Sequence, residues 1–301
     1  MKINKIIFAC SCNSSSSEKP DEYNGFWNIQ SKLWKVGLGI EPVCLLFGKK
    51  EKTNMTEEFG KIIEMDIIPD IPLTVQLTWS KFDYPTREPD TTWIMGDIDM
   101  LPLQSNHFIR NIEDVPDDHF AHLNAGGNCN NRNTFLEQGS QIHCGFGKSG
   151  YPGADLPGHY WVGKGKRFEI FTENKSFLEQ VTHISKSYKY GLGAKMGTPI
   201  ERAKTQGFAN VNSYYWCSEE MRSSELMWDA IRNKSVKYSP FFYSSDQRID
   251  RTFWMEDKKD YLYSHENLAN KKIVDIHCMR PYEKQKDACE KIIETSKILI
   301  K

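Results

Sequence analysis

Short apolar runs and amphipathic stretches alternate along the first hundred residues. Three apolar runs have the length of buried strands, at 3–10, 42–47 and 91–95. Apolar residues recur at helical spacing between these runs, which predicts helices at 26–36, 57–64 and 73–83. Gly37 should end the first of these helices, and Pro85 limits the third. Strands that alternate with helices predict βαβ units and a mostly parallel sheet.

The sequence changes character beyond residue 123. Residues 124–166 are rich in glycine and asparagine and show little periodicity, which predicts loops and short strands. Helical patterns return farther on, and a short strand precedes the last of them: helices at 168–188, 218–232 and 281–299, strand at 271–277. We find neither an internal repeat nor a linker, so we expect an α/β chain that folds as a single domain over 1–301.

Composition narrows the class of protein. The 39 basic and 40 acidic residues leave a net charge of −1, whereas a general nucleic-acid binder carries a basic excess. Hydrophobic residues make up 39% of the 301 and supply a sizeable core. No apolar run approaches a membrane span of about 20 residues, and the run at 6–9 is too short for a secretion signal. Eight scattered cysteines are too few for a disulfide scaffold. We therefore expect a soluble, cytoplasmic protein without a nucleic-acid partner or a membrane span.

The most informative local pattern is a pair of aspartates, Asp97 and Asp99, that follows the third apolar run and Gly96. In an extended segment the two carboxylates share a face, and at the end of a parallel strand they would point to where α/β sheets bind ligands. Two hard oxygen ligands suit Mg²⁺ or Mn²⁺, which keep positions free for phosphate oxygens. The alternative is a turn with two solvated aspartates, but the strand, the glycine and the following Leu101-Pro102 favour a metal site.

Asp97-Ile98-Asp99 after an apolar strand resembles the D-x-D motif of GT-A glycosyltransferases, metal-dependent enzymes that use nucleotide-sugar donors. Segments at 9–13, 34–46 and 156–168 resemble the family's nucleotide-binding loop, its second βα unit and a strand of viral and bacterial surface-glycan transferases. The resemblance covers most of the chain. It implies a GT-A fold: a Rossmann-like, mostly parallel central sheet flanked by helices, a Gly/Asn-rich acceptor-side region and a C-terminal helix. Residues 1–105 would bind the nucleotide sugar, and residues 106–301 the acceptor.

The resemblance also implies roles on the donor side. A UDP-, GDP- or dTDP-sugar would contact nine residues: Ala9, Cys10, Ser11, Ser80, Lys81, Gly96, Asp97, Ile98 and Arg280. Asp97, Asp99 and the late His277 would hold the metal, and an imidazole ligand favours Mn²⁺ over Mg²⁺. The alternative for His277 is a buried, hydrogen-bonded histidine. The planar fork of Arg280 matches phosphate oxygens.

A reaction that inverts the sugar needs a base to take the acceptor proton, whereas a retaining reaction does not require one. Glu219 and Glu220 follow an aromatic segment and resemble the family's acidic motif, although the family often has an aspartate in this pair. With Ser218 as the N-cap, both would lie in the first turn of a helix, where acids also complement the helix dipole. Asp246 is the rival base, for which a structural role in a capped helix is preferred.

On the acceptor side, aromatic rings suit the apolar faces of sugars. The residues expected to face a glycan or glycoprotein acceptor are Trp161, Lys164 and Trp216. Ordinary core packing is the alternative for the aromatic residues.

Two other patterns carry less weight. Gly145–Ser149 lacks the first glycine of a phosphate loop, and His119 and His122 fit either one helical face or opposite faces of a strand.

The sequence therefore predicts a metal-dependent glycosyltransferase of the hexosyl or pentosyl class. A nucleotidyltransferase also pairs aspartates with a metal and phosphates. It typically has a Gly-rich, basic loop after its first strand, where this chain has a Ser-rich loop with Glu18 and Asp21. The second alternative is a non-catalytic protein of the same fold that binds glycans or nucleotide sugars.

Overall fold

A computed structural model describes residues 1–12, 23–125, 156–189, 212–242, 247–249, 268 and 270–299. The chain divides into two compact units. Unit 1 combines Met1–Asp66, Thr92–Pro116 and Tyr243–Lys301, and unit 2 combines Ile67–Thr91 and Asp117–Phe242. The expected single domain, with halves at 1–105 and 106–301, stays a prediction. In the described ranges, no helix is both long enough and apolar enough to cross a membrane.

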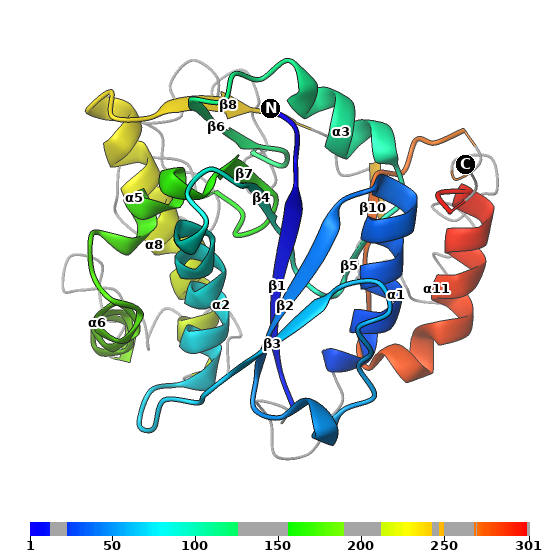
Figure 1. Cartoon of the computed structure of the whole chain (residues 1–301), viewed down its shortest axis with the longest axis horizontal. Helices are drawn as coiled ribbons and strands as arrows, with labels where there is room; N and C mark the ends of the chain where they lie inside the picture. The colour runs from blue at the N-terminus through cyan, green and yellow to red at the C-terminus, as the bar shows by residue number, and fades with distance from the viewer. Residues whose placement is uncertain are drawn as a thin grey trace, which may run out of the picture. The chain divides into compact units, whose positions relative to one another are not determined.

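Unit 1 is built on four parallel strands in the order β3-β2-β1-β4. Their bounds are β1 Lys5–Ser11, β2 Glu41–Phe47, β3 Lys61–Met65 and β4 Thr92–Met95. Figure 1 shows β1, β2 and β3 side by side. Within the sheet, Ile7 of β1 pairs with Val43 on one side and with Met95 on the other. A central parallel strand is covered on both faces, which is why Ile6, Ile7 and Phe8 form a continuous buried run.

Aromatic side chains pack the first helical segment of unit 1 against this sheet. The segment runs as a 3₁₀ turn, an α-helix and a π turn in succession: η1 Asn24–Phe26, α1 Trp27–Lys32 and η2 Leu33–Leu38. Phe8 of β1 meets Trp27 and Trp34 edge-on, each with ring centroids 6.4 Å apart. Trp34 also contacts Phe108, with centroids 5.0 Å apart. The rings therefore set how α1 lies on the sheet.

Among the described residues, the rest of unit 1 comprises a short 3₁₀ turn, two further helices and a small second sheet. These are η3 Lys50–Lys52, α3 Ser105–Glu113 and α11 Tyr282–Ser296, with strands β5 Met100–Pro102, β9 Arg248–Ile249 and β10 Asp275–His277. β10 lies between the other two strands, antiparallel to β5 and parallel to β9. The Arg248 guanidinium donates two hydrogen bonds of 2.8 Å to the buried carboxylate of Asp275. This bidentate pairing offsets the cost of burying the charge.

In the part of unit 2 that the structure describes, three strands follow the order β7-β6-β8. They are β6 His119–His122, β7 Trp161–Lys164 and β8 Lys237–Pro240, and β6 runs antiparallel to β7 and parallel to β8. The described helices of this unit are α2 Leu73–Asp83, η4 Tyr84–Arg87, η5 Gly165–Phe168, α5 Glu169–Thr172, α6 Phe177–Lys189 and α8 Asn212–Arg232. Phe82 packs on Phe171 with centroids 4.4 Å apart, and Phe120 packs on Phe168 at 5.0 Å.

The predicted α/β class, with a mostly parallel sheet flanked by helices, is confirmed. The apolar runs at 3–10, 42–47 and 91–95 correspond to β1, β2 and β4, and the helix predicted at 73–83 has the bounds of α2. The helix predicted at 57–64 is wrong. Lys61–Met65 forms β3 instead, because its pairing with β2 outweighs the local helical spacing.

The structure also corrects the bounds of three predicted helices and decides whether His119–His122 is helix or strand. The first helix ends at Gly39 rather than at Gly37, since Gly39 adopts the left-handed backbone, with a φ of 75°, that ends the π turn. The helix predicted at 168–188 is interrupted between α5 and α6, where Glu173 has a φ of 52°. The helix predicted from residue 218 begins at Asn212. His119–His122 forms strand β6, so the two histidines lie on opposite faces.

Two glycines with positive φ provide a matched test of this packing. Gly48 follows β2 with a φ of 110°, and a Cβ there would clash with the Cys12 Sγ. Gly39 has a φ of 75°, and in the described part of the chain a Cβ there would meet nothing within 4 Å. We expect Gly39→Ala to cost only the left-handed backbone term, about 1–2 kcal/mol, and Gly48→Ala to cost clearly more. Urea unfolding measures both; equal losses would contradict the contact between Cys12 and Gly48.

Candidate functional site

The order of the parallel strands in unit 1 reverses at β1. β2 lies on one side of β1 and β4 on the other, so the connections that leave these strands diverge. Sheets of this kind bind ligands beside the carboxyl ends of the strands at such a reversal. Here those ends carry Ala9, Cys10 and Ser11 in β1 and Gly96 after β4, four residues that the sequence assigned to the nucleotide.

Gly96 lets the chain leave β4 close to β1. Its amide donates to the Ile7 carbonyl at 2.9 Å. A Cβ at this position would lie 2.9 Å from Ile6 Cδ1 and would also press on the Phe8 ring. Any larger residue would therefore push the following turn away from the end of β1.

A four-residue turn, Asp97–Met100, carries both aspartates. The Met100 amide donates to the Asp97 carbonyl at 3.0 Å and closes the turn. Ile98 is buried, Asp97 is partly exposed, and Asp99 is only 4% exposed. The two carboxylates therefore differ in their surroundings, and Asp99 is the one enclosed by protein.

β10 and the residues after it bring the predicted partners of Asp99 to its side chain. His277 Nε2 lies 3.7 Å from Asp99 Oδ2, and Arg280 Nε lies 3.8 Å from the same oxygen. The Cys278 amide donates to the Asp99 carbonyl at 2.8 Å, which fixes the two segments together. The Arg280 guanidinium also lies over the Tyr23 ring, 4.5 Å from its centroid. Three residues that the sequence predicted for metal and phosphate, Asp99, His277 and Arg280, thus converge.

This arrangement fits a divalent metal in part. Among the described residues, no group of three or more His, Cys, Asp or Glu side chains could hold a metal ion. Asp99 and His277 offer one carboxylate and one imidazole, a donor set that suits Mn²⁺. Neighbouring ligands of an octahedral ion with bonds of about 2.0–2.2 Å lie about 3 Å apart, so a small approach from 3.7 Å suffices. The pair fits as two ligands, with Asp97 as the candidate for a third.

A second polar cluster lies in unit 2, where α2 packs against α8. Lys81 Nζ lies 3.0 Å from Glu219 Oε1, and the two side chains are 6% and 9% exposed. Gly158 packs directly on this carboxylate, and a Cβ there would lie 2.7 Å from the Glu219 carboxyl carbon. The resemblance implied different roles for Lys81 and Glu219, nucleotide contact and base, whereas the structure joins them in one buried ion pair. A nearby positive charge favours the ionised form of a carboxyl group.

The expected N-cap at Ser218 is wrong. α8 begins at Asn212, so Ser218 lies inside the helix and the two glutamates lie beyond its first turn. The Trp79 indole donates to the Ser218 hydroxyl at 3.4 Å, and this contact belongs to the packing of α2 on α8. The helix dipole at the N-terminus therefore no longer explains these acids, because its effect is confined to the first turn.

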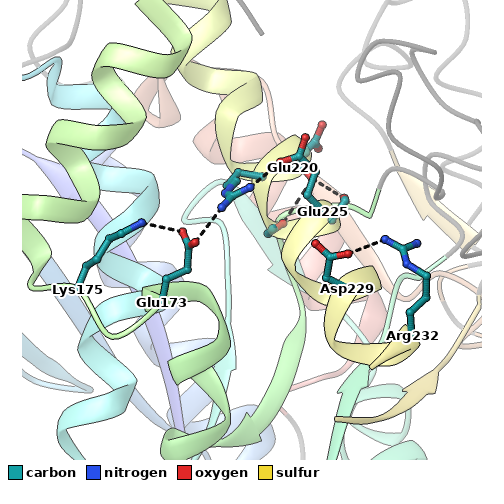
Figure 2. A network of polar contacts seen from close by, with 9 residues as sticks. Glu173, Lys175, Glu220, Glu225, Asp229 and Arg232 are labelled. Carbon is teal, nitrogen blue, oxygen red and sulfur yellow. Dashed lines mark hydrogen bonds and ion pairs between the residues drawn. The ribbon is translucent and has the colours of Figure 1, made fainter. Parts of the chain in front are cut away.

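Glu220, the second candidate base, belongs to a different environment. It lies on α8 with Glu225 and Asp229, beside the network of charges in Figure 2. Arg222 bridges Glu173 and Glu225, with 2.9 Å to each carboxylate. Burial raises the pKa of Glu173, but the hydrogen bonds and charges of Arg222 and Lys175 together outweigh burial and leave this pKa lowered. Glu220 is half-buried, and Glu219 has a buried cationic partner in Lys81.

Buried aromatic and histidine rings surround the predicted acceptor residue Trp161. Its ring is fully buried and stacks on His122, with centroids 4.1 Å apart and planes 9° apart. His122 Nε2 lies 3.1 Å from the His159 carbonyl, which only accepts, so the proton is on Nε2 and the Tyr238 hydroxyl donates to Nδ1 at 3.3 Å. Burial lowers the pKa of His122 to about 3. In this conformation the ring of Trp161 is part of the core, and its acceptor role stays a prediction.

The remaining predicted residues have simpler surroundings. Ser80 is buried and its hydroxyl donates to the Leu77 carbonyl of its own helix at 2.9 Å. Lys164 donates to the Asp90 carbonyl at 3.0 Å and lies 3.4 Å from the Asp117 carboxylate. Cys10 is buried with its Sγ 3.5 Å from Cys44. Asp246, Gly145–Ser149 and the side chain of Trp216 lie outside the described residues.

Two polar side chains near the aspartates, Arg248 partly buried and Gln30 fully buried, were not expected from the sequence. Arg248 pairs with Asp275 on β10, two residues before His277, and no local pattern marks it. Gln30 lies on α1 with its amide against the aspartate turn. A signal for Gln30 does exist, since a single amide interrupts the buried face that Trp27 and Trp34 form.

Comparison with known proteins finds similarity among solved structures. The chain matches no protein-family model and no curated protein. It is similar to the crystal structure of a galactosyltransferase, LgtC, in complex with donor and acceptor sugar analogues. The likeness covers 99% of this chain and 96% of that chain, with 12% sequence identity and a TM-score of 0.44. At this level of likeness, the roles of individual residues have to be judged from their own geometry.

The buried ion pair of unit 2 yields a quantitative prediction. Removing one partner leaves the other charge buried without compensation. Lys81→Met and Glu219→Gln should therefore each lower the free energy of unfolding by about 3–5 kcal/mol. The double variant should lose much less than the sum, because neither charge is then buried alone. Urea unfolding of the four proteins measures this coupling.

The exposed pair of Lys49 and Glu64, 2.9 Å apart with side chains 58% and 39% exposed, is the control. The same double-mutant cycle there should show weak coupling, because solvent screens the charges. Additive losses for Lys81→Met and Glu219→Gln would contradict a direct interaction between the two groups.

Proposed function

We propose that this protein is a glycosyltransferase that binds a nucleotide-diphosphate sugar beside the carboxyl ends of β1 and β4 in unit 1. One observation carries the proposal: the D-x-D turn follows β4 where the strand order reverses, and Asp99 there has His277 and Arg280 within 4 Å. The reversal supports nucleotide binding, and the aspartate pair with an imidazole supports a metal-bound diphosphate.

The residues of unit 1 have separable tasks in this proposal. Ala9, Cys10 and Ser11 border the nucleotide with Gly96, Asp97 and Ile98. Asp97, Asp99 and His277 hold the metal, for which Mn²⁺ is preferred over Mg²⁺ because of the imidazole ligand. A bound divalent cation would offset the negative charge that develops on the departing diphosphate. Arg280, which rests on the Tyr23 ring, supplies a further cation for a phosphate oxygen.

Glu219 is the better supported base for an inverting reaction. Lys81 is within 3.0 Å of its carboxylate, which favours the ionised form that a proton acceptor needs. Glu220 and Asp246 remain rival assignments. A retaining reaction would not require the base, and Glu219 would then serve the packing of α2 on α8. The acceptor, a glycan or glycoprotein, is assigned to Lys164, Trp161 and Trp216. The sugar transferred is a hexose or a pentose.

We expect nucleotide binding that depends on Mn²⁺ and on Asp99. Calorimetric titration with UDP, GDP and dTDP, with and without Mn²⁺, should show one nucleotide whose affinity rises when the metal is present. Asp99→Asn keeps the shape of the side chain but removes a charged ligand, so it should weaken this binding by at least about 10–100-fold, the usual loss for groups that only support a ligand. Asp114→Asn, an exposed aspartate of unit 1 at the end of α3, should leave the affinity unchanged.

Products distinguish the alternatives. A glycosyltransferase cleaves the bond between the sugar and the diphosphate, so it releases the nucleoside diphosphate and passes the sugar to an acceptor or to water. A nucleotidyltransferase breaks a bond within the phosphates, and a binding protein releases neither product. Nucleotide binding that ignores both Mn²⁺ and Asp99→Asn would refute the metal site.

A further inference from the structure

One buried amide contacts the backbone of the aspartate turn at three points. Gln30 of α1 is fully buried, and its Nε2 lies 3.2 Å from the Asp97 carbonyl, 3.2 Å from the Ile98 carbonyl and 2.7 Å from the Met100 carbonyl. Two N–H groups therefore serve three acceptors, and one hydrogen is shared between two of them. All three carbonyls belong to the turn that carries both aspartates.

The orientation of this amide follows from its partners. The Trp34 indole donates to Gln30 Oε1 at 3.1 Å. An indole N–H only donates and a carbonyl oxygen only accepts, so the oxygen must face Trp34 and the NH₂ group must face the turn. A glutamate would have the same shape, but it would set a carboxylate oxygen against three carbonyl oxygens. The site is therefore specific for an amide.

We propose that Gln30 is a positioning residue that sets the backbone of the D-x-D turn and, through it, the directions of the Asp97 and Asp99 carboxylates. Buried carbonyls need donors. The Met100 amide donates to the Asp97 carbonyl and the Cys278 amide donates to the Asp99 carbonyl, and the carbonyls of Asp97, Ile98 and Met100 have Gln30 Nε2 as a further donor. Gln30 supplies this donor from a helix that Trp27 and Trp34 pack against β1. The link to metal binding rests on the proposed function, whereas the effect on the turn does not.

Gln76 offers a matched control. It is also fully buried, on α2 of unit 2, and its Nε2 donates to the carbonyls of Ile68 and Ile71 at 3.0 and 2.8 Å. Its Oε1 accepts from the Ile68 amide at 2.8 Å. Gln30→Glu and Gln76→Glu each replace an NH₂ that faces backbone carbonyls with a carboxylate oxygen. Both should therefore lower the free energy of unfolding, and only Gln30→Glu should change the aspartate turn.

The test has two readouts, made at a temperature where both variants are folded. Titration with Mn²⁺ in the presence of the nucleotide should show a dissociation constant about 10–100-fold higher for Gln30→Glu and unchanged for Gln76→Glu. Hydrogen exchange without metal should be faster in Gln30→Glu alone at the amides of Met100 and Cys278, which donate to carbonyls of the turn.

Each outcome bears on the proposal. Unchanged exchange and unchanged Mn²⁺ affinity in folded Gln30→Glu would overturn it, as would equal effects of the two variants on the turn. Failure of the wild-type protein to bind Mn²⁺ would remove the proposed function, while hydrogen exchange would still decide the role of Gln30. Gln30→Met, with Gln76→Met as its control, removes the donors without adding charge and replaces the first pair if Gln30→Glu does not fold.

Discussion

The pairing of β1 with β2 and β4 is the interaction on which the rest of unit 1 depends. Ile6, Ile7 and Phe8 are buried in this sheet, and Phe8 meets the rings of Trp27 in α1 and Trp34 in η2. Because all these strands are parallel, their carboxyl ends share one edge of the sheet. The chain that leaves β4 at Gly96 must then turn beside the end of β1. The position of the two aspartates is thus a consequence of strand pairing.

Buried polar groups form the second level of organisation. An isolated amide or charge in the interior is costly unless a partner satisfies it. Gln30 donates to the carbonyls of the aspartate turn, and Arg248 donates to Asp275 on the strand that carries His277. In unit 2, Lys81 forms an ion pair with Glu219. Each pairing involves a segment that carries predicted chemistry, so packing and site geometry are coupled.

Features that are local in sequence were predictable. β1, β2 and β4 are short apolar runs with sharp ends, and the aspartate pair directly follows one of them. β3 was missed because its five residues include exposed positions, and only its pairing with β2 makes it a strand. The pair of Lys81 and Glu219 was missed because the two residues are far apart along the chain. The true start of α8 at Asn212 was hidden by the aromatic residues before Ser218, which are weak helix formers.

The central claim is that the D-x-D turn of unit 1 holds a metal that in turn holds a nucleotide diphosphate. A crystal of the protein grown with Mn²⁺ and the nucleotide that binds best tests it most directly, through the anomalous scattering of manganese. The account predicts an anomalous peak within bonding distance of Asp99 Oδ2 and His277 Nε2, with diphosphate oxygens on the same ion. A well-ordered nucleotide with no manganese beside Asp99, or manganese bound elsewhere, would contradict it.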